Sequence, residues 1–143
     1  MAKPLIHKTI THVISAHHRL ISNRLNHEEN VEVFSKCMGL YGHGHNYKLK
    51  ATYRWSYDQE DPFFIQSIDE SLQELVVRPF LYKSLNVEFE RMGIENPVTT
   101  GEQIIEVLGH ILEKSPISDY LDQIELVETR KNSFFYQFNN FRI

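Results

Sequence analysis

The sequence has few of the features that would point to a secreted, membrane-bound or nucleic-acid-binding protein. Its single cysteine, Cys37, excludes a disulfide bond within the chain and favours a reducing compartment, the cytoplasm. No apolar run approaches the roughly 20 residues of a membrane span, and we expect no signal peptide because the N-terminal segment lacks a long apolar core. No lysine and arginine stripe is present, and the formal net charge is −4. We therefore expect neither a membrane nor a nucleic acid as partner.

The composition is that of an ordinary globular protein. Of the 143 residues, 41% are hydrophobic and 24% are charged, a balance that argues against a disordered chain. No repeat, low-complexity segment or linker divides the sequence. We therefore expect residues 1–143 to form a single domain.

Four segments have the composition or the period of β-strands. One is rich in β-branched side chains, and another, starting at His43, places alternate residues on one face. The expected strands are residues 8–18, 43–55, 123–130 and 133–141. The polar segment 21–33 is expected to be a long loop.

Two segments have helical periodicity. Apolar residues recur at helical spacing over 64–76, and Pro79 is expected to end this helix because it disfavours helical geometry in the residue before it. The second helix is expected to begin at Thr100, with Gln103 completing a capping box. The element order predicts an α+β fold with both helices on one face of an antiparallel sheet. The uncovered face of such a sheet favours oligomerisation.

Three of the eight histidines fit one metal site. His43 and His45 are two apart on an expected strand, so their side chains leave the same face. His18 ends the first expected strand and can complete the set if the two strands pair. Three histidines with an open fourth position are typical of catalytic zinc. The H-x-H pair alone favours two surface histidines, but Gly42 and Gly44, which allow close backbone approach, favour the metal site.

Cys37 has two interpretations. A lone cysteine is usually a small buried hydrophobe. Beside a dication its thiolate form is favoured, and it can then act as a base or nucleophile. Lys36 acts in the same direction.

The segments "ISAHHRL", "EENVEVFSKC" and "GHGHNY" together resemble the 6-pyruvoyltetrahydropterin synthase family. The resemblance runs from about Thr9 to Tyr136 and is far more specific than two histidines alone. The bacterial 6-carboxytetrahydropterin synthase of queuosine biosynthesis shares these motifs. The step of six residues from Cys37 to His43 is similar to that of the animal-type pyruvoyl enzyme.

This resemblance implies a tunnelling fold, an assembly and a reaction. A four-stranded antiparallel sheet carries two helices, three sheets close into a barrel, and two trimers stack as a homohexamer. The reaction is loss of triphosphate from 7,8-dihydroneopterin triphosphate, a step of tetrahydrobiopterin biosynthesis, with zinc as cofactor. The implied residues are the zinc ligands His18, His43 and His45, the catalytic Cys37, and the pterin-binding Glu128, Thr100 and Glu102.

One motif departs from the family pattern. Where the family has Asp and His in a segment like L-D-H-K-x-L-N, this chain has Leu81 and Tyr82, while Lys83, Leu85 and Asn86 still match. Leu81 cannot carry a proton, and Tyr82 is a poor base at neutral pH. Three hypotheses remain open. The protein is a zinc-dependent enzyme of this family that is slow or altered in product, or a pterin-binding paralogue that keeps zinc and Glu128 but has lost turnover, or its histidines and Cys37 only satisfy local packing.

Overall fold

The computed structural model describes residues 4–20, 24–34, 42–58 and 63–139. Within them, four strands form one antiparallel sheet in the order β1-β2-β3-β4. The strands are β1 (Leu5–His18), β2 (His43–Ser56), β3 (Leu121–Val127) and β4 (Ser133–Gln137). This sheet confirms the predicted α+β class.

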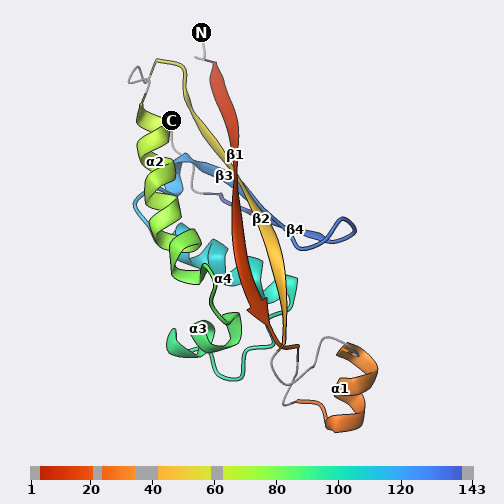
Figure 1. The fold of residues 1–143 in the computed structure, drawn as a ribbon. Helices are drawn as coiled ribbons and strands as arrows, with labels where there is room; N and C mark the ends of the chain where they lie inside the picture. The colour runs from red at the N-terminus through yellow and green to blue at the C-terminus, as the bar shows by residue number, and fades with distance from the viewer. Residues whose placement is uncertain (1–3, 21–23, 35–41, 59–62, 140–143) are drawn as a thin grey trace.

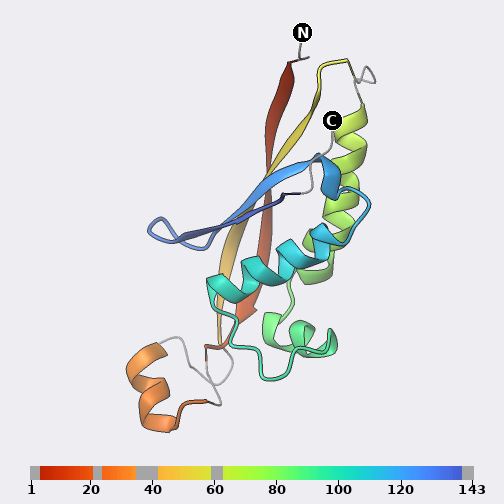
Figure 2. The ribbon, with the colours of Figure 1, turned by 180° about the vertical axis from the view of Figure 1, so that it is seen from behind.

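Helices pack on one face of the sheet. The described helices are α1 (His27–Phe34), α2 (Phe64–Leu72), α3 (Leu85–Arg91) and α4 (Gly101–Glu113). Figures 1 and 2 show α2 and α4 on the same side of the sheet, α3 near the end of β1, and α1 apart from the others. None of the helices described has the length and apolar character needed to cross a membrane.

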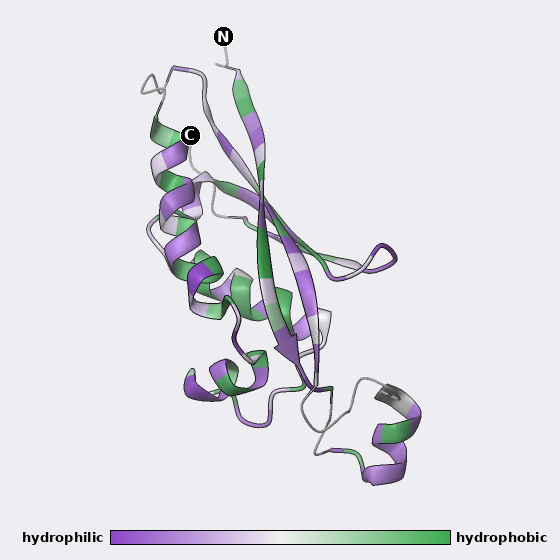
Figure 3. Ribbon diagram, in the orientation of Figure 1, coloured by the Kyte–Doolittle hydropathy of each residue, from purple (hydrophilic) through white to green (hydrophobic). Residues whose placement is uncertain are grey.

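The core lies between the sheet and the helices α2 and α4. Alternate residues of β2, from Tyr47 to Tyr53, are buried, as the period of two predicts. Hydrophilic and hydrophobic residues accordingly follow one another along the strands in Figure 3. The opposite face of the sheet carries exposed apolar side chains, Val13 on β1 and Phe135 on β4.

The expected loop over 21–33 is wrong, because α1 begins at His27. Asn26 and Glu29 form a reciprocal capping box: the Glu29 N–H donates to Asn26 Oδ1 (2.8 Å), and the Asn26 N–H donates to Glu29 Oε1 (3.0 Å). The prediction overlooked this local signal in a strongly polar segment. The short helix α3 was also not predicted, although Ser84 caps it by accepting from the Val87 N–H.

The helix that contains α2 ends close to the predicted place but in a different way. Beyond Leu72 it continues as a π-helical turn, Gln73–Val77, and a 3₁₀ turn, Arg78–Phe80. Arg78 therefore keeps helical backbone angles despite Pro79, and the chain becomes extended only at Leu81.

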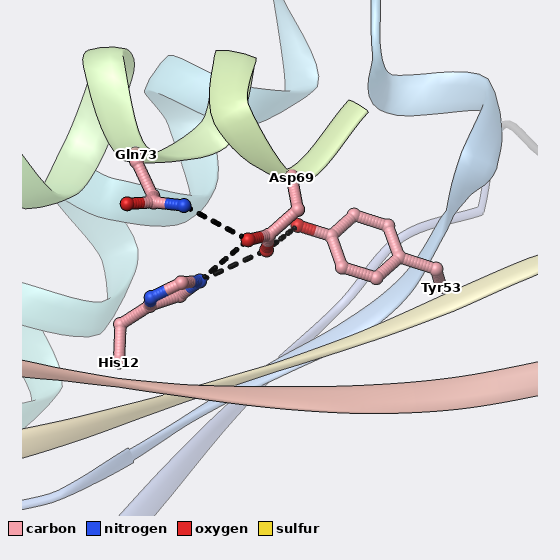
Figure 4. Close-up of polar contacts among 4 residues, drawn as sticks. All are labelled: His12, Tyr53, Asp69 and Gln73. Carbon is pink, nitrogen blue, oxygen red and sulfur yellow. Dashed lines mark hydrogen bonds and ion pairs between the residues drawn. The ribbon is translucent and has the colours of Figure 1, made fainter. Parts of the chain in front are cut away.

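A buried carboxylate, Asp69, ties α2 to the sheet (Figure 4). His12 Nε2 lies 2.9 Å from both of its oxygens, the Tyr53 hydroxyl donates to Oδ1 at 2.6 Å, and Gln73 Nε2 donates to Oδ2 at 3.0 Å. Burial, with the Asp69 charge and hydrogen bond, raises the pKa of the Tyr53 hydroxyl, which stays protonated. His12 is thus part of the packing between β1 and α2.

Candidate functional site

The pairing of β1 with β2 brings the three candidate histidines together. The register places His18 opposite His43 and Ala16 opposite His45. The side chain of His18 faces the helices with Ala16 and is buried, whereas His17 is exposed on the other face. The end of one strand therefore meets the start of the next, and three imidazoles gather there.

A glycine allows the chain to approach His18 at this point. Gly42 has a φ of +74°, and a Cβ at this position would lie 2.2 Å from the His18 carbonyl oxygen. A Cβ on Gly44 would lie 3.8 Å from its nearest neighbour, the Ala16 carbonyl oxygen, an ordinary contact. The expected close approach is therefore a property of Gly42.

The ring nitrogens of the three histidines converge. His18 Nε2 lies 3.1 Å from His43 Nε2, which lies 2.7 Å from His45 Nε2. One nitrogen from each ring lies within 4.8 Å of the others. His18 Nδ1 lies 2.7 Å from the Thr99 carbonyl oxygen, which can only accept a hydrogen bond. Nδ1 therefore carries the proton, and the lone pair of His18 Nε2 is available to a metal.

All three imidazoles are neutral at neutral pH. Burial lowers the pKa of His18 to about 4; the bond to Thr99 opposes this shift, and the neighbouring histidines add to it. Burial also lowers the pKa of His43, with a further decrease from His45 and an opposing effect of Glu128. Burial alone lowers the pKa of His45. Neutral imidazole is the form that ligates metals.

This donor set fits a zinc ion. Zinc is bound by imidazole nitrogen, and catalytic sites commonly use three protein ligands. The bond from His18 Nδ1–H to a carbonyl is the outer-sphere contact that ligating histidines usually make. His18, His43 and His45 could therefore hold the metal through Nε2.

Glu128 lies close enough to His43 for the two charges to affect each other. It directly follows β3 and is half-buried; its backbone N–H donates to the Asn132 carbonyl at 3.0 Å. Burial raises the pKa of the Glu128 carboxyl; the nearby His43 opposes this shift, and the charge of Glu102 adds to it. The end of β3 thus places the Glu128 carboxylate near His43, and the first turn of α4 places the Glu102 carboxylate near Glu128.

Thr100 is the N-cap of α4, as predicted, and its hydroxyl accepts from the Gln103 N–H at 3.3 Å. The other half of the expected capping box is displaced by one residue, because Gln103 Oε1 accepts from the Thr99 N–H at 2.8 Å. The role of Thr99 was not predicted. It acts through its backbone, so residue type carries no signal for it.

The remaining candidates lie in different surroundings. Cys37 falls outside the described residues. Leu81 is half-buried against the hydrophobic core, whereas the side chain of Tyr82 is 81% exposed. The Tyr82 backbone has a φ of 59°, and its N–H donates to the Ser15 carbonyl on β1 at 2.6 Å. The Tyr82 ring therefore points away from the core of its own chain.

Together the fold and the histidine cluster define an α+β protein with a candidate metal centre where two paired strands end. The family model described as 6-pyruvoyl tetrahydropterin synthase matches residues 7–139, and the chain belongs to this family.

Three similar proteins illustrate the relationship. The 6-pyruvoyl tetrahydrobiopterin synthase of Poecilia reticulata is 33% identical over 86% of this chain and 84% of its own length. That of Drosophila melanogaster is 29% identical over 94% of this chain and 81% of its own length. The solved structure of the Caenorhabditis elegans 6-pyruvoyl tetrahydropterin synthase is 29% identical and superposes with a TM-score of 0.81, covering 96% of this chain and 99% of that one.

Proposed function

We propose that the protein is a zinc-dependent carbon–oxygen lyase of the 6-pyruvoyltetrahydropterin synthase type. Its substrate would be 7,8-dihydroneopterin triphosphate, from which it would eliminate triphosphate. The observation that carries the proposal is the convergence of three neutral imidazoles, His18, His43 and His45, beside the carboxylate of Glu128. Family membership supports the substrate class.

The residues of the chain would divide the work as follows. The three histidines hold the metal through Nε2. When bound, zinc would supply a Lewis acid that polarises the side-chain oxygens of the substrate and makes the neighbouring C–H more acidic. Glu128 accepts hydrogen bonds from the amino and ring N–H groups of the pterin, because a carboxylate offers two acceptor oxygens to a paired donor edge.

Further residues would complete the site. Thr100 and Glu102, at the start of α4, would help to bind the pterin next to Glu128. The charge of Glu102 contributes to the raised pKa of the Glu128 carboxyl. We propose that the Cys37 thiolate removes the proton from this C–H of the substrate and later returns it.

A second candidate function is a pterin-binding paralogue that no longer turns over. The observation that favours it is the environment of the two residues that replace the family's Asp and His. Leu81 packs against the core and has no proton to transfer, and Tyr82 is largely exposed. In this second candidate function, neither residue would replace the family's proton relay.

We also propose that the subunits assemble as a homohexamer. The sheet face opposite the helices exposes Val13 and Phe135, and β1 and β4 are the two edge strands. If the sheets of neighbouring subunits closed into a barrel, the two edge strands would pair and the two exposed apolar side chains would be covered. Native mass spectrometry measures the state directly, and a monomer at micromolar concentration would contradict this part of the proposal.

The decisive experiment incubates zinc-loaded protein with 7,8-dihydroneopterin triphosphate and measures triphosphate release together with the pterin product. The 6-pyruvoyl product supports the proposed enzyme, and the 6-carboxy product would assign the protein to the queuosine-type reaction instead. Pterin binding without triphosphate release supports the paralogue. If the protein neither binds the pterin nor releases triphosphate, both candidate functions are refuted.

A further inference from the structure

The orientation of His18 depends on a single backbone carbonyl in an unusual conformation. The Thr99 carbonyl accepts the bond from His18 Nδ1 at 2.7 Å across 81 residues of sequence. Thr99 is fully buried and has a φ of 59°. A β-branched residue rarely adopts this left-handed conformation, so surrounding groups must hold it there.

Gln103 holds Thr99 from the side of α4. Its Oε1 accepts the Thr99 N–H at 2.8 Å, one residue before the N-cap. The Thr100 hydroxyl in turn accepts the Gln103 N–H at 3.3 Å. Thr99, whose carbonyl bonds to His18, is therefore held through its N–H by the first turn of α4.

Asn86, at the start of α3, holds the other partner of the bond. Its Oδ1 accepts the Arg19 N–H at 2.8 Å, and its Nδ2 donates to the Arg19 carbonyl at 2.9 Å, immediately after His18. The same Nδ2 lies 3.4 Å from the Pro97 carbonyl. The Thr99 hydroxyl lies 3.3 Å from the Arg19 carbonyl and 3.4 Å from Asn86 Oδ1. One amide side chain thus bridges the two segments that His18 and Thr99 belong to.

We propose that Asn86 and Gln103 are positioning residues that set the ring orientation and the tautomer of His18 and thereby its affinity for the metal. Among the described residues, neither side chain hydrogen-bonds an imidazole; Asn86 binds the backbone next to His18, and Gln103 binds that of Thr99. With that bond in place, the proton stays on Nδ1 and Nε2 points toward His43. Without that bond, the proton can move from Nδ1 to Nε2. A protonated Nε2 has no lone pair to offer to the metal. The inference rests on the metal binding proposed above.

The first test is zinc affinity, measured by competition with a chromophoric chelator. Loss of outer-sphere partners of a metal-bound histidine typically weakens binding about 10- to 100-fold. We expect a loss of about 10-fold or more for Asn86→Ala and for Gln103→Ala. Gln103→Glu keeps an oxygen that can accept the Thr99 N–H and should bind zinc at least as tightly as the native protein. Glu106→Ala, an exposed position one turn further along α4, is the matched control and should bind normally.

The second test reads the tautomer in the metal-free protein. In ¹⁵N-histidine spectra we expect the native His18 to carry its proton on Nδ1, and Gln103→Ala to show a mixture of both tautomers or a switch to Nε2. Asn86→Asp keeps the acceptor for Arg19 and loses both donor contacts, so it replaces Asn86→Ala if the latter does not fold.

The outcomes separate this inference from the proposed function. If the native protein binds no zinc, the proposed metal site is wrong, and the tautomer spectra still decide the role of the two amides. If the native protein binds zinc and folded Gln103→Ala has the native affinity and tautomer, the inference is overturned. Lower thermal stability with unchanged affinity would likewise assign Gln103 a structural role only.

Discussion

Replacement of His18 by alanine tests the candidate metal centre most sharply, because the chain offers a matched control in the adjacent residue. His18 is 1% exposed and faces the other two histidines, whereas His17 is exposed on the opposite face of β1. Loss of His18 removes a candidate metal ligand and also the donor to the Thr99 carbonyl. Loss of His17 removes neither.

The expected magnitudes differ between the metal-free and the zinc-bound protein. Without metal, His18→Ala leaves a buried carbonyl without its donor, which costs about 1–3 kcal/mol in the free energy of unfolding, and the vacated space adds to this. Zinc at about 100 times its dissociation constant should stabilise the native protein and His17→Ala by about 2.7 kcal/mol. For His18→Ala we expect a zinc-dependent gain close to zero at the same concentration.

The measurement is urea unfolding followed by circular dichroism, with chelator and with zinc, at one protein concentration. The concentration is kept constant because assembly makes stability concentration-dependent. Equal stabilisation of His18→Ala and the native protein by zinc would refute the assignment of His18 as a ligand. If zinc no longer stabilised His17→Ala, the assignment of His18, and not His17, to the face of the other two histidines would be refuted.

The pH dependence of the metal-free protein gives a second readout of the same residue. The pKa of His18 is lowered from 6.5 to about 4 in the folded state, so the unfolded chain takes up the proton first as the pH falls. The stability contributed by neutral His18 is therefore present above about pH 6.5 and is lost toward pH 4, by at most about 1.4 kcal/mol per pH unit. His18→Ala should lack this part of the slope. An unchanged slope would contradict burial as the cause of the shift.

Other residues give independent predictions. Glu128→Ala should weaken pterin binding. In the native protein, pterin affinity should fall as the pH decreases through the raised pKa of Glu128, because the protonated carboxyl accepts fewer hydrogen bonds. Calorimetry that finds the same pterin affinity for Glu128→Ala and the native protein would disprove this role of Glu128. The double change Leu81→Asp with Tyr82→His should speed triphosphate release by about 10²–10⁴ if a missing relay limits turnover, and an unchanged rate would place proton transfer elsewhere. Asp69→Ala should cost about 3–5 kcal/mol in unfolding free energy, since it leaves the buried Tyr53 and the partly buried His12 without their acceptor. Asp69→Asn keeps one acceptor oxygen and should cost about 1–3 kcal/mol; equal losses for the two variants would mean that packing dominates there.

The elements predicted correctly are those whose signal is local. The period of two in β2 places His43 and His45 on one face whatever their partners are, and Thr100 caps α4 through contacts within a single turn. The helix α1 shows the limit of reading local composition. Its acidic, polar sequence was interpreted as a loop, although the residues of its capping box, Asn26 and Glu29, are only three apart.

Other features depend on groups that residue type does not reveal. Asp69 is an unremarkable helical aspartate in the sequence, and only the packing of α2 on the sheet buries it against His12 and Tyr53. The Thr99 carbonyl is a backbone atom, so its bond to His18 has no signature in the sequence at all.

The sequence by itself determined the faces of the strands, the cap of α4 and the family to which the chain belongs, because periodicity, capping and motifs are properties of neighbouring residues. Only the tertiary structure decided that His18 meets His43, that Glu128 and Glu102 lie near each other, and that Asn86 hydrogen-bonds the backbone of Arg19, the residue after His18. Each of these contacts joins residues at least 25 positions apart. Their formation depends on strand register and on how the helices pack on the sheet, which no local pattern specifies.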